Sequence, residues 1–237
     1  IGPILQGAVY AKKEKTYDGD LNKILPIIIH GDAAIAGQGV NYEQANMSQI
    51  DGYKIGGIVH IVLNNQVGFT ANYKEGRSSV YCTDLAKVTE SPVFHVNADD
   101  PLAVVHAMQM AILVRQTFNI DVYIDILGYR RYGHNESDEP RFTQPQLYKN
   151  IPKHPNIYNV YLDNLVNQGD ISKDEAKSLQ QSFKDTLQQK LNYAKENPIK
   201  PSIEELTGEW KNYRLATDED FDESIKTGIE KQLLDTI

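Results

Sequence analysis

Four short apolar runs, rich in β-branched residues, constrain the fold more than any other feature of this chain. They span residues 25–29, 58–63, 93–96 and 120–127 of the 237 residues. The first two are nearly continuous instead of alternating with polar residues, which is typical of strands covered on both faces of a parallel sheet. The segments between the runs are long enough for crossover helices. The sequence therefore predicts an α/β fold with a doubly wound, mostly parallel sheet.

Two helices are expected between these strands. Residues 101–118 start at Pro101, which suits a first helical position, and follow Asp100, which can cap the first turn. The apolar content of this segment predicts a largely buried helix, and the residues that carry it are Leu102, Val105, Met108, Ile112 and Leu113. Residues 40–49 are expected to form a shorter helix.

The sequence becomes polar and helical from about Tyr148. We therefore expect an α/β ligand-binding domain in residues 1–147 and a helical extension in residues 148–237. The extension would pack on this domain, on chain outside this sequence or on another subunit. Because the chain opens at Ile1 and not at methionine, we expect a piece of a longer protein.

One long helix is predicted within the extension. Ser172 and Glu175 form a capping-box pattern, and an apolar stripe continues until Asn197 and Pro198 stop the helix. The residues of the stripe are Ala176, Leu179, Phe183, Leu187, Leu191 and Ala194. Residues 200–217 are then expected to form an irregular linker, and residues 218–234 a last, acidic helix.

The charge balance narrows the classes of partner. Lys and Arg total 24 against 32 Asp and Glu, which gives a net charge of -8 and argues against a general nucleic-acid binder. An anionic ligand would need a metal ion or backbone amides at its site to offset this negative charge. No apolar run approaches the roughly 20 residues of a membrane-spanning helix, so a cytosolic or organelle-matrix protein is expected. The single Cys82 gives no reason to expect a thiol nucleophile.

Polar residues follow the first two predicted strands. Asp32 comes directly after the first strand and is followed by small residues, and Asn65 ends the second, 65 − 32 = 33 positions later. Since the carboxyl ends of neighbouring parallel strands meet at one edge of a sheet, both groups would lie close together. Asp32 could hold a cation while the Ala33 and Ala34 amides hold oxygens of the same ligand. Gly-Asp and Asn-Asn are also common at turns and strand ends, so each half alone is a weak signal.

The two strand ends together resemble a known cofactor motif. Gly31-Asp32-Ala33 followed by Asn64-Asn65 is similar to the thiamine-diphosphate motif, usually Gly-Asp-Gly and then Asn-Asn, with Ala33 replacing the last glycine. That replacement is characteristic of the 2-oxoglutarate dehydrogenase family. The similarity to the decarboxylating component of that family extends over nearly the whole chain, in residues 30–39, 64–70, 77–87, 94–101 and 129–145.

This resemblance implies the thiamine-diphosphate-binding fold and a set of ligands. Asp32 and Asn65 would bind Mg²⁺ through their side chains and Val67 through its main-chain carbonyl, while Ala33 would lie beside the diphosphate. The complete enzyme would decarboxylate 2-oxoglutarate and pass the succinyl group to the lipoyl arm of a dihydrolipoamide succinyltransferase. It would be a homodimer, located in the cytoplasm of a bacterium or in the mitochondrial matrix of a eukaryote.

The resemblance also implies what the chain lacks. The family activates its cofactor with a glutamate on a separate pyrimidine-binding domain and recognises substrate with histidines upstream of Ile1, so we expect the isolated chain to be inactive. Two alternatives stay open: a component of 2-oxoadipate dehydrogenase, and a noncatalytic fold or interaction domain.

A polar loop follows the fourth predicted strand and contains His134. In the resembled family this loop borders the cofactor, so His134 is a candidate catalytic residue for diphosphate contact or loop ordering; a purely structural histidine is an equal alternative. Arg130 and Arg131 are expected to pair with acidic residues of the loop. His30, His60 and His95 are interpreted as hydrogen-bonded structural residues.

Overall fold

The computed structural model describes residues 1–199 and 206–236. Its contacts divide the chain into two compact units, Ile1–Lys177 and Ser178–Ile237, which we describe separately. The functional boundary that we predict between residues 147 and 148 concerns ligand binding and stays a prediction.

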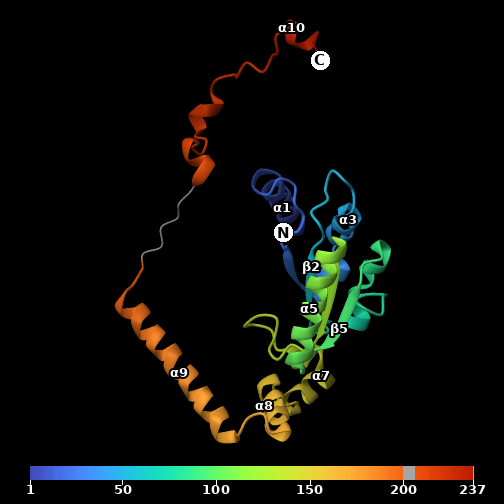
Figure 1. Cartoon of the computed structure of the whole chain (residues 1–237), viewed down its shortest axis with the longest axis vertical. Helices are drawn as coiled ribbons and strands as arrows, with labels where there is room; N and C mark the ends of the chain where they lie inside the picture. Colours follow the sequence, from blue (N-terminus) through green and yellow to red (C-terminus); the bar gives the residue numbers. More distant parts are fainter. Residues whose placement is uncertain (200–205, 237) are drawn as a thin grey trace. The chain divides into compact units, whose positions relative to one another are not determined.

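The first unit contains a sheet of four parallel strands (Figure 1). These are β1 (Ile27–Gly31), β2 (Val59–Asn64), β5 (Val93–Asn97) and β6 (Val122–Leu127), and their order across the sheet is β1-β2-β6-β5. All four correspond to predicted strands, with ends shifted by at most two residues. The predicted α/β fold with a mostly parallel sheet is confirmed.

Helices lie on both faces of this sheet because the chain crosses it in opposite directions. The β1-to-β2 connection contains α2 (Asp32–Gly37) and α3 (Gly39–Met47), and α3 confirms the shorter predicted helix. The return from β5 to β6 contains α5 (Pro101–Phe118). Right-handed crossovers in opposite directions place their helices on opposite faces. The two resulting cores pack Ile35, Ala45, Val62 and Tyr123 on one side, and Val59, Ala107, Ala111 and Ile124 on the other.

The ends of α5 agree with the sequence prediction. Asp100 caps the helix by accepting a hydrogen bond from the Ala103 amide at 3.0 Å, and Asn119 ends it in the left-handed region at φ 55°. Both ends are determined by local sequence, which explains the agreement.

The prediction that α5 is largely buried is wrong. Only Ala107, Ala111 and Arg115 are buried, whereas Leu102 and Leu113 are 58% and 60% exposed. The reason is geometric, since the sheet covers one side of the helix and the apolar residues extend around it. The buried charge of Arg115 nevertheless has hydrogen-bond partners, because its guanidinium donates to the Gly57 and Ile55 carbonyls at 3.0 and 3.1 Å.

Several shorter elements complete the first unit. A hairpin of β3 (Val67–Gly68) and β4 (Ala71–Asn72) follows β2 and is antiparallel. The helical elements are α1 (Gly2–Thr16), α4 (Tyr73–Gly76), the 3-10 helix η1 (Asp84–Thr89), α6 (Pro140–Thr143), α7 (Pro145–Asn150), η2 (Ile151–Lys153) and α8 (Ile157–Gln168).

The long helix α9 (Lys173–Glu196) begins in the first unit and continues into the second. Its predicted capping box is present, because the Glu175 amide donates to Ser172 Oγ at 3.2 Å and the Ser172 amide donates to the Glu175 carboxylate at 2.9 Å. The stripe predicted on α9 is mostly exposed, at 64% for Leu179 and Phe183.

The prediction of a last helix over residues 218–234 is wrong. The structure has only the 3-10 helix η4 (Asp218–Phe221) and the single turn α10 (Lys231–Leu234), with irregular backbone between them. Gly228 lies in that irregular part, and Ile225 is exposed, so no burial compensates the cost of helix formation. In the predicted linker, residues 200–205 lie outside the described part, and η3 (Gly208–Asn212) follows.

Within the described residues, no helix is both long and apolar enough to cross a membrane.

Candidate functional site

The first part of the site is the carboxyl end of β1. Gly31 ends the strand in extended conformation and Asp32 starts α2, so the Asp32 carboxylate is buried beside the first turn of a helix. Burial raises the pKa of Asp32 above its usual value; the Arg77 charge and hydrogen bonds from the backbone amides of Asp32, Asn65 and Ala33 act in the opposite direction.

The second part is the carboxyl end of β2, and it meets the first. The Asn65 backbone amide lowers the pKa of the nearby Asp32 carboxylate, and the parallel register sets Gly31 of β1 beside Leu63 of β2, so the two strand ends adjoin. The Asn65 side chain turns the backbone, because its Oδ1 accepts from the Val67 amide at 3.0 Å. The expected proximity of Asp32 and Asn65 is therefore present in the structure.

Small residues permit this close approach. A Cβ atom added at Gly68 would lie 2.7 Å from the Ala33 Cβ, well inside van der Waals contact. The hairpin after β2 thus packs directly on the first turn of α2, and Ala33 is placed next to the joined strand ends.

Arg77, which begins one of the stretches that carry the family resemblance, belongs to this cluster. Its Nη1 lies 3.4 Å from Asp32 Oδ2, and its side chain is only 9% exposed. Its Nε is buried without a hydrogen-bond partner among the described residues. A buried guanidinium with a free donor is suited to an anionic oxygen.

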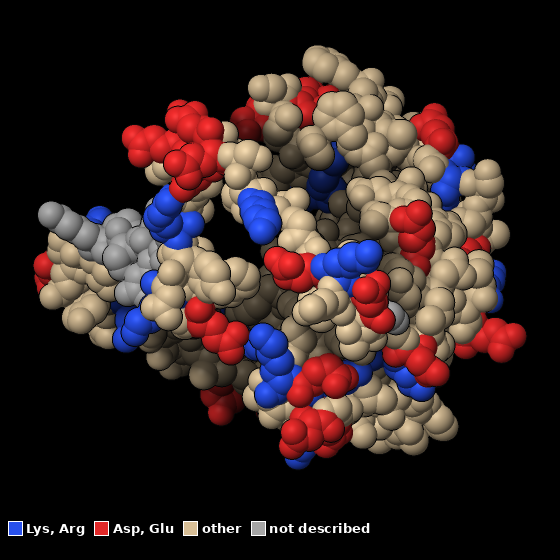
Figure 2. Space-filling view, turned by 90° about the horizontal axis from the view of Figure 1, so that it is seen from above, with Lys and Arg blue, Asp and Glu red and all other residues tan. Residues whose placement is uncertain are grey.

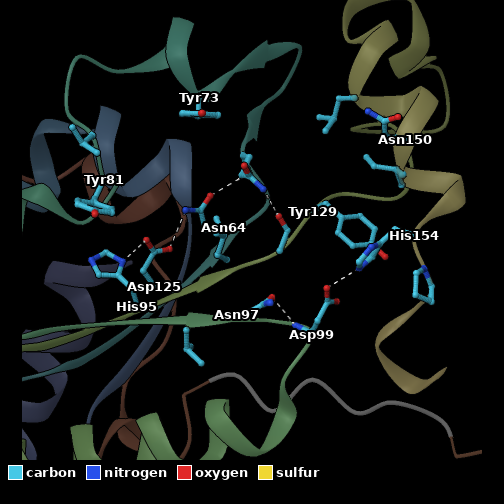
Figure 3. Close-up of a pocket in the computed structure, with 18 of the residues that line it drawn as sticks. Asn64, Tyr73, Tyr81, His95, Asn97, Asp99, Asp125, Tyr129, Asn150 and His154 are labelled. Carbon is cyan, nitrogen blue, oxygen red and sulfur yellow. Dashed lines mark hydrogen bonds and ion pairs between the residues drawn. The ribbon is translucent and has the colours of Figure 1, made fainter. Parts of the chain in front are cut away.

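A pocket of about 1010 Å³ adjoins the cluster at the ends of β2, β5 and β6 (Figure 3). On one side, His95 Nδ1 lies 3.0 Å from Asp125 Oδ2, and Asp125 Oδ1 accepts from Asn64 Nδ2 at 3.0 Å. On the other side, His154 Nε2 lies 2.7 Å from Asp99 Oδ2. His95 is hydrogen-bonded as predicted, whereas the pocket and the contact between Asp125 and Asn64 had no signal in the sequence.

His134 lies on the loop after β6 and is exposed. Its backbone amide donates to Asp138 Oδ2 at 2.8 Å, and its ring meets the Phe69 ring edge-on with centroids 4.8 Å apart. Arg130 donates to the Phe69 carbonyl at 2.8 Å and lies 3.8 Å from the Asp138 carboxylate, so its expected acidic partner is present. The loop is therefore held against the hairpin that follows Asn65.

The remaining residues singled out in the sequence make contacts that suit a structural role. His30 Nε2 lies 2.9 Å from His60 Nδ1, and burial, followed by the charge of His60, lowers the pKa of His30 to about 4. Burial raises the pKa of Cys82 to about 12, in keeping with an unreactive thiol. Arg131 stacks on the Tyr132 ring.

The donor set of the strand-end cluster fits a magnesium diphosphate. In the described part of the chain, no group of three or more His, Cys, Asp and Glu side chains could hold a metal, so a site here depends on one carboxylate supplemented by neutral oxygens. Asp32, the Asn65 side-chain oxygen and the Val67 carbonyl are hard oxygen donors of the kind Mg²⁺ prefers. Basic and acidic residues are interspersed on the face shown in Figure 2, so an anion would depend on local donors such as Arg77.

The parallel sheet with this cluster at its carboxyl edge defines the class: an α/β protein with a ligand site at its strand ends. The chain belongs to the dehydrogenase E1 component family, which matches residues 2–203. This confirms the resemblance seen in the motifs, and membership in the family implies thiamine diphosphate as cofactor.

The similar proteins are much longer than this chain. It is 45% identical over 214 residues to the 2-oxoglutarate dehydrogenase E1 component of Azotobacter vinelandii, covering 90% of this chain and 23% of that protein. It is 45% identical over 188 residues to the protein of that name from Haemophilus influenzae, covering 79% and 20%. A multifunctional 2-oxoglutarate metabolism enzyme of Mycobacterium sp. strain JLS is 38% identical over 240 residues, covering 99% and 18%. The chain thus spans about a fifth of the length of these relatives.

Proposed function

We propose that this chain is the diphosphate- and magnesium-binding part of a 2-oxoglutarate dehydrogenase E1 component. The complete enzyme would decarboxylate 2-oxoglutarate and succinylate the lipoyl group of a dihydrolipoamide succinyltransferase. The names of these relatives favour 2-oxoglutarate over 2-oxoadipate as substrate. We also propose a homodimer, in the cytoplasm if the source is a bacterium and in the mitochondrial matrix if it is a eukaryote.

The observation that carries this proposal is the meeting of the two strand ends: Gly31 pairs with Leu63 in the parallel register, and Gly68 packs closely on Ala33. It unites the two halves of the motif in one cluster. Asp32, Asn65 and the Val67 carbonyl would hold Mg²⁺, which neutralises the diphosphate. The Ala33 amide and the free donor of Arg77 would bind diphosphate oxygens.

The cofactor, when bound, supplies the ring that stabilises the carbanion formed on decarboxylation. The residues of this chain bind and orient it. His134 would contact the diphosphate or keep the loop after β6 ordered at the site; its contacts with Phe69 and Asp138 support the second role in particular.

The metal assignment is tested by calorimetric titration of the full-length apoenzyme with thiamine diphosphate in the presence of Mg²⁺. Asp32→Ala and Asn65→Ala should each weaken cofactor binding by about 100-fold or more, because each removes a metal ligand. Asp84→Ala is a matched control, since this carboxylate is paired with Lys87 at 2.7 Å and lies at the start of η1. Wild-type affinity in both ligand variants would refute the proposed magnesium site.

A further inference from the structure

Two His–Asp pairs line the same pocket (Figure 3). They differ in how deeply the aspartate is buried and in the further contacts of its carboxylate. In the Asp99–His154 pair, both side chains are partly exposed. In the Asp125–His95 pair, Asp125 is 3% exposed, and its second oxygen accepts from Asn64 at 3.0 Å. A hydrogen bond to a buried carboxylate is stronger than one between neutral groups, so Asn64 is firmly held.

Asn64 also fixes the conformation of the backbone turn that follows β2. Its Oδ1 accepts from the Gln66 amide at 3.1 Å, and its carbonyl accepts from the Gly128 amide at 2.8 Å. Gln66 adopts φ 65°, a left-handed conformation that is unfavourable for a residue other than glycine. The Gln66 side chain also donates to the Gly128 carbonyl at 2.8 Å, so the turn is tied to the end of β6.

The strained turn carries the proposed metal ligands on both sides of Gln66. Asn65 precedes it and Val67 follows it, so a change at Gln66 would redirect both oxygens. We infer that Asp125 is a positioning residue: through Asn64 it holds the conformation of the turn whose flanking residues, Asn65 and Val67, would supply their oxygens to the same ion as Asp32. This inference rests on the proposed function, because it presumes that these oxygens bind Mg²⁺.

The test compares variants of the full-length apoenzyme by titration with thiamine diphosphate at several Mg²⁺ concentrations. Asp125→Leu removes the acceptor and should raise the Mg²⁺ concentration needed for half-maximal cofactor binding by about tenfold or more, the usual effect of losing a residue that orients a ligand. Asp125→Asn keeps an oxygen for Asn64 and should stay within about threefold of wild type. Asp99→Leu, in the other pair, should leave the Mg²⁺ requirement unchanged.

A second comparison serves if Asp125→Leu does not fold. Asn64→Asp places two carboxylates together and should weaken Mg²⁺-dependent binding by about tenfold, whereas the exchange of the two residues, Asn64→Asp with Asp125→Asn, restores the pair and should recover most of the loss. Unfolding midpoints are recorded for every variant, because a purely structural Asp125 would lower the midpoint and leave the Mg²⁺ requirement unchanged.

The inference is overturned if Asp125→Leu binds like wild type, if Asp99→Leu is affected equally, or if neither Asp125→Asn nor the exchange recovers binding. Asp32→Ala separates this result from a failure of the proposed function. If Asp32→Ala binds the cofactor normally, the proposed metal site is wrong. If Asp32→Ala loses cofactor binding and the Asp125 variants do not, the metal site is supported and the proposed role of Asp125 is wrong.

Discussion

The two faces of the parallel sheet bury different kinds of side chain. Under α5, the packed residues are aliphatic, as in Val59, Val122 and Ile124. On the opposite face, aliphatic residues alternate with hydrogen-bonded polar pairs, His60 with His30 and Asn64 with Asp125. The two faces therefore have different roles. The face under α5 contributes hydrophobic burial, whereas polar contacts on the opposite face connect the strands to the ligand site.

Truncation of the aliphatic face should give the largest loss of stability. Ile124→Ala should lower the free energy of unfolding of the sheet by about 2–5 kcal/mol, because Ile124 is 1% exposed and its removal leaves a cavity. Native-state hydrogen exchange of the β6 amides measures the change. Ile29→Ala is the matched control, since this isoleucine is 64% exposed and should cost less than about 1 kcal/mol. Equal losses would mean that the face under α5 is not the main source of stability.

The polar face should make stability depend on pH. His30 has a folded pKa of about 4 against 6.5 for a free histidine, so the unfolded chain binds more protons between these values. The contribution of His30 is therefore complete above about pH 6.5 and is lost as the pH falls toward about 4. Thermal unfolding of the wild type and His30→Gln across this range measures it. The variant should show a shallower decline, and identical slopes would contradict the assignment.

The smallest effect is expected at a polar atom without a partner. The Tyr123 hydroxyl is buried and has no hydrogen-bond partner among the described residues, so Tyr123→Phe should be neutral or stabilise the sheet by up to about 1 kcal/mol. Tyr148→Phe is the control, because its hydroxyl donates to the Tyr132 carbonyl at 3.2 Å and should cost about 1 kcal/mol. A marked loss in Tyr123→Phe would reveal a hidden partner, such as ordered water.

Local and long-range contacts differ in how well the sequence predicts them. The strands and α5 were predictable because apolar runs and caps are local signals, as at Asp100 and Asn119. The meeting of Asp32 with Asn65 was predictable because neighbouring parallel strands align their ends.

The roles of Asp125, Asn64 and Arg77 could not be predicted in this way. Asn64 and Asp125 are 61 residues apart, and Arg77 and Asp32 are 45 apart, so only the folded sheet brings each pair together. The error over residues 218–234 has a related cause: a helical pattern without a surface to pack on does not fix a helix.

The contact between Gly68 and Ala33 limits how this sequence can change over time. With only 2.7 Å available between the Ala33 methyl and a Cβ at position 68, one of the two positions can carry a methyl group while the other must stay glycine. A chain with the more usual glycine at position 33 would have room for alanine at position 68. The two positions, 35 residues apart by 68 − 33, should therefore vary as a pair, and a homologue that departs at one is expected to compensate at the other.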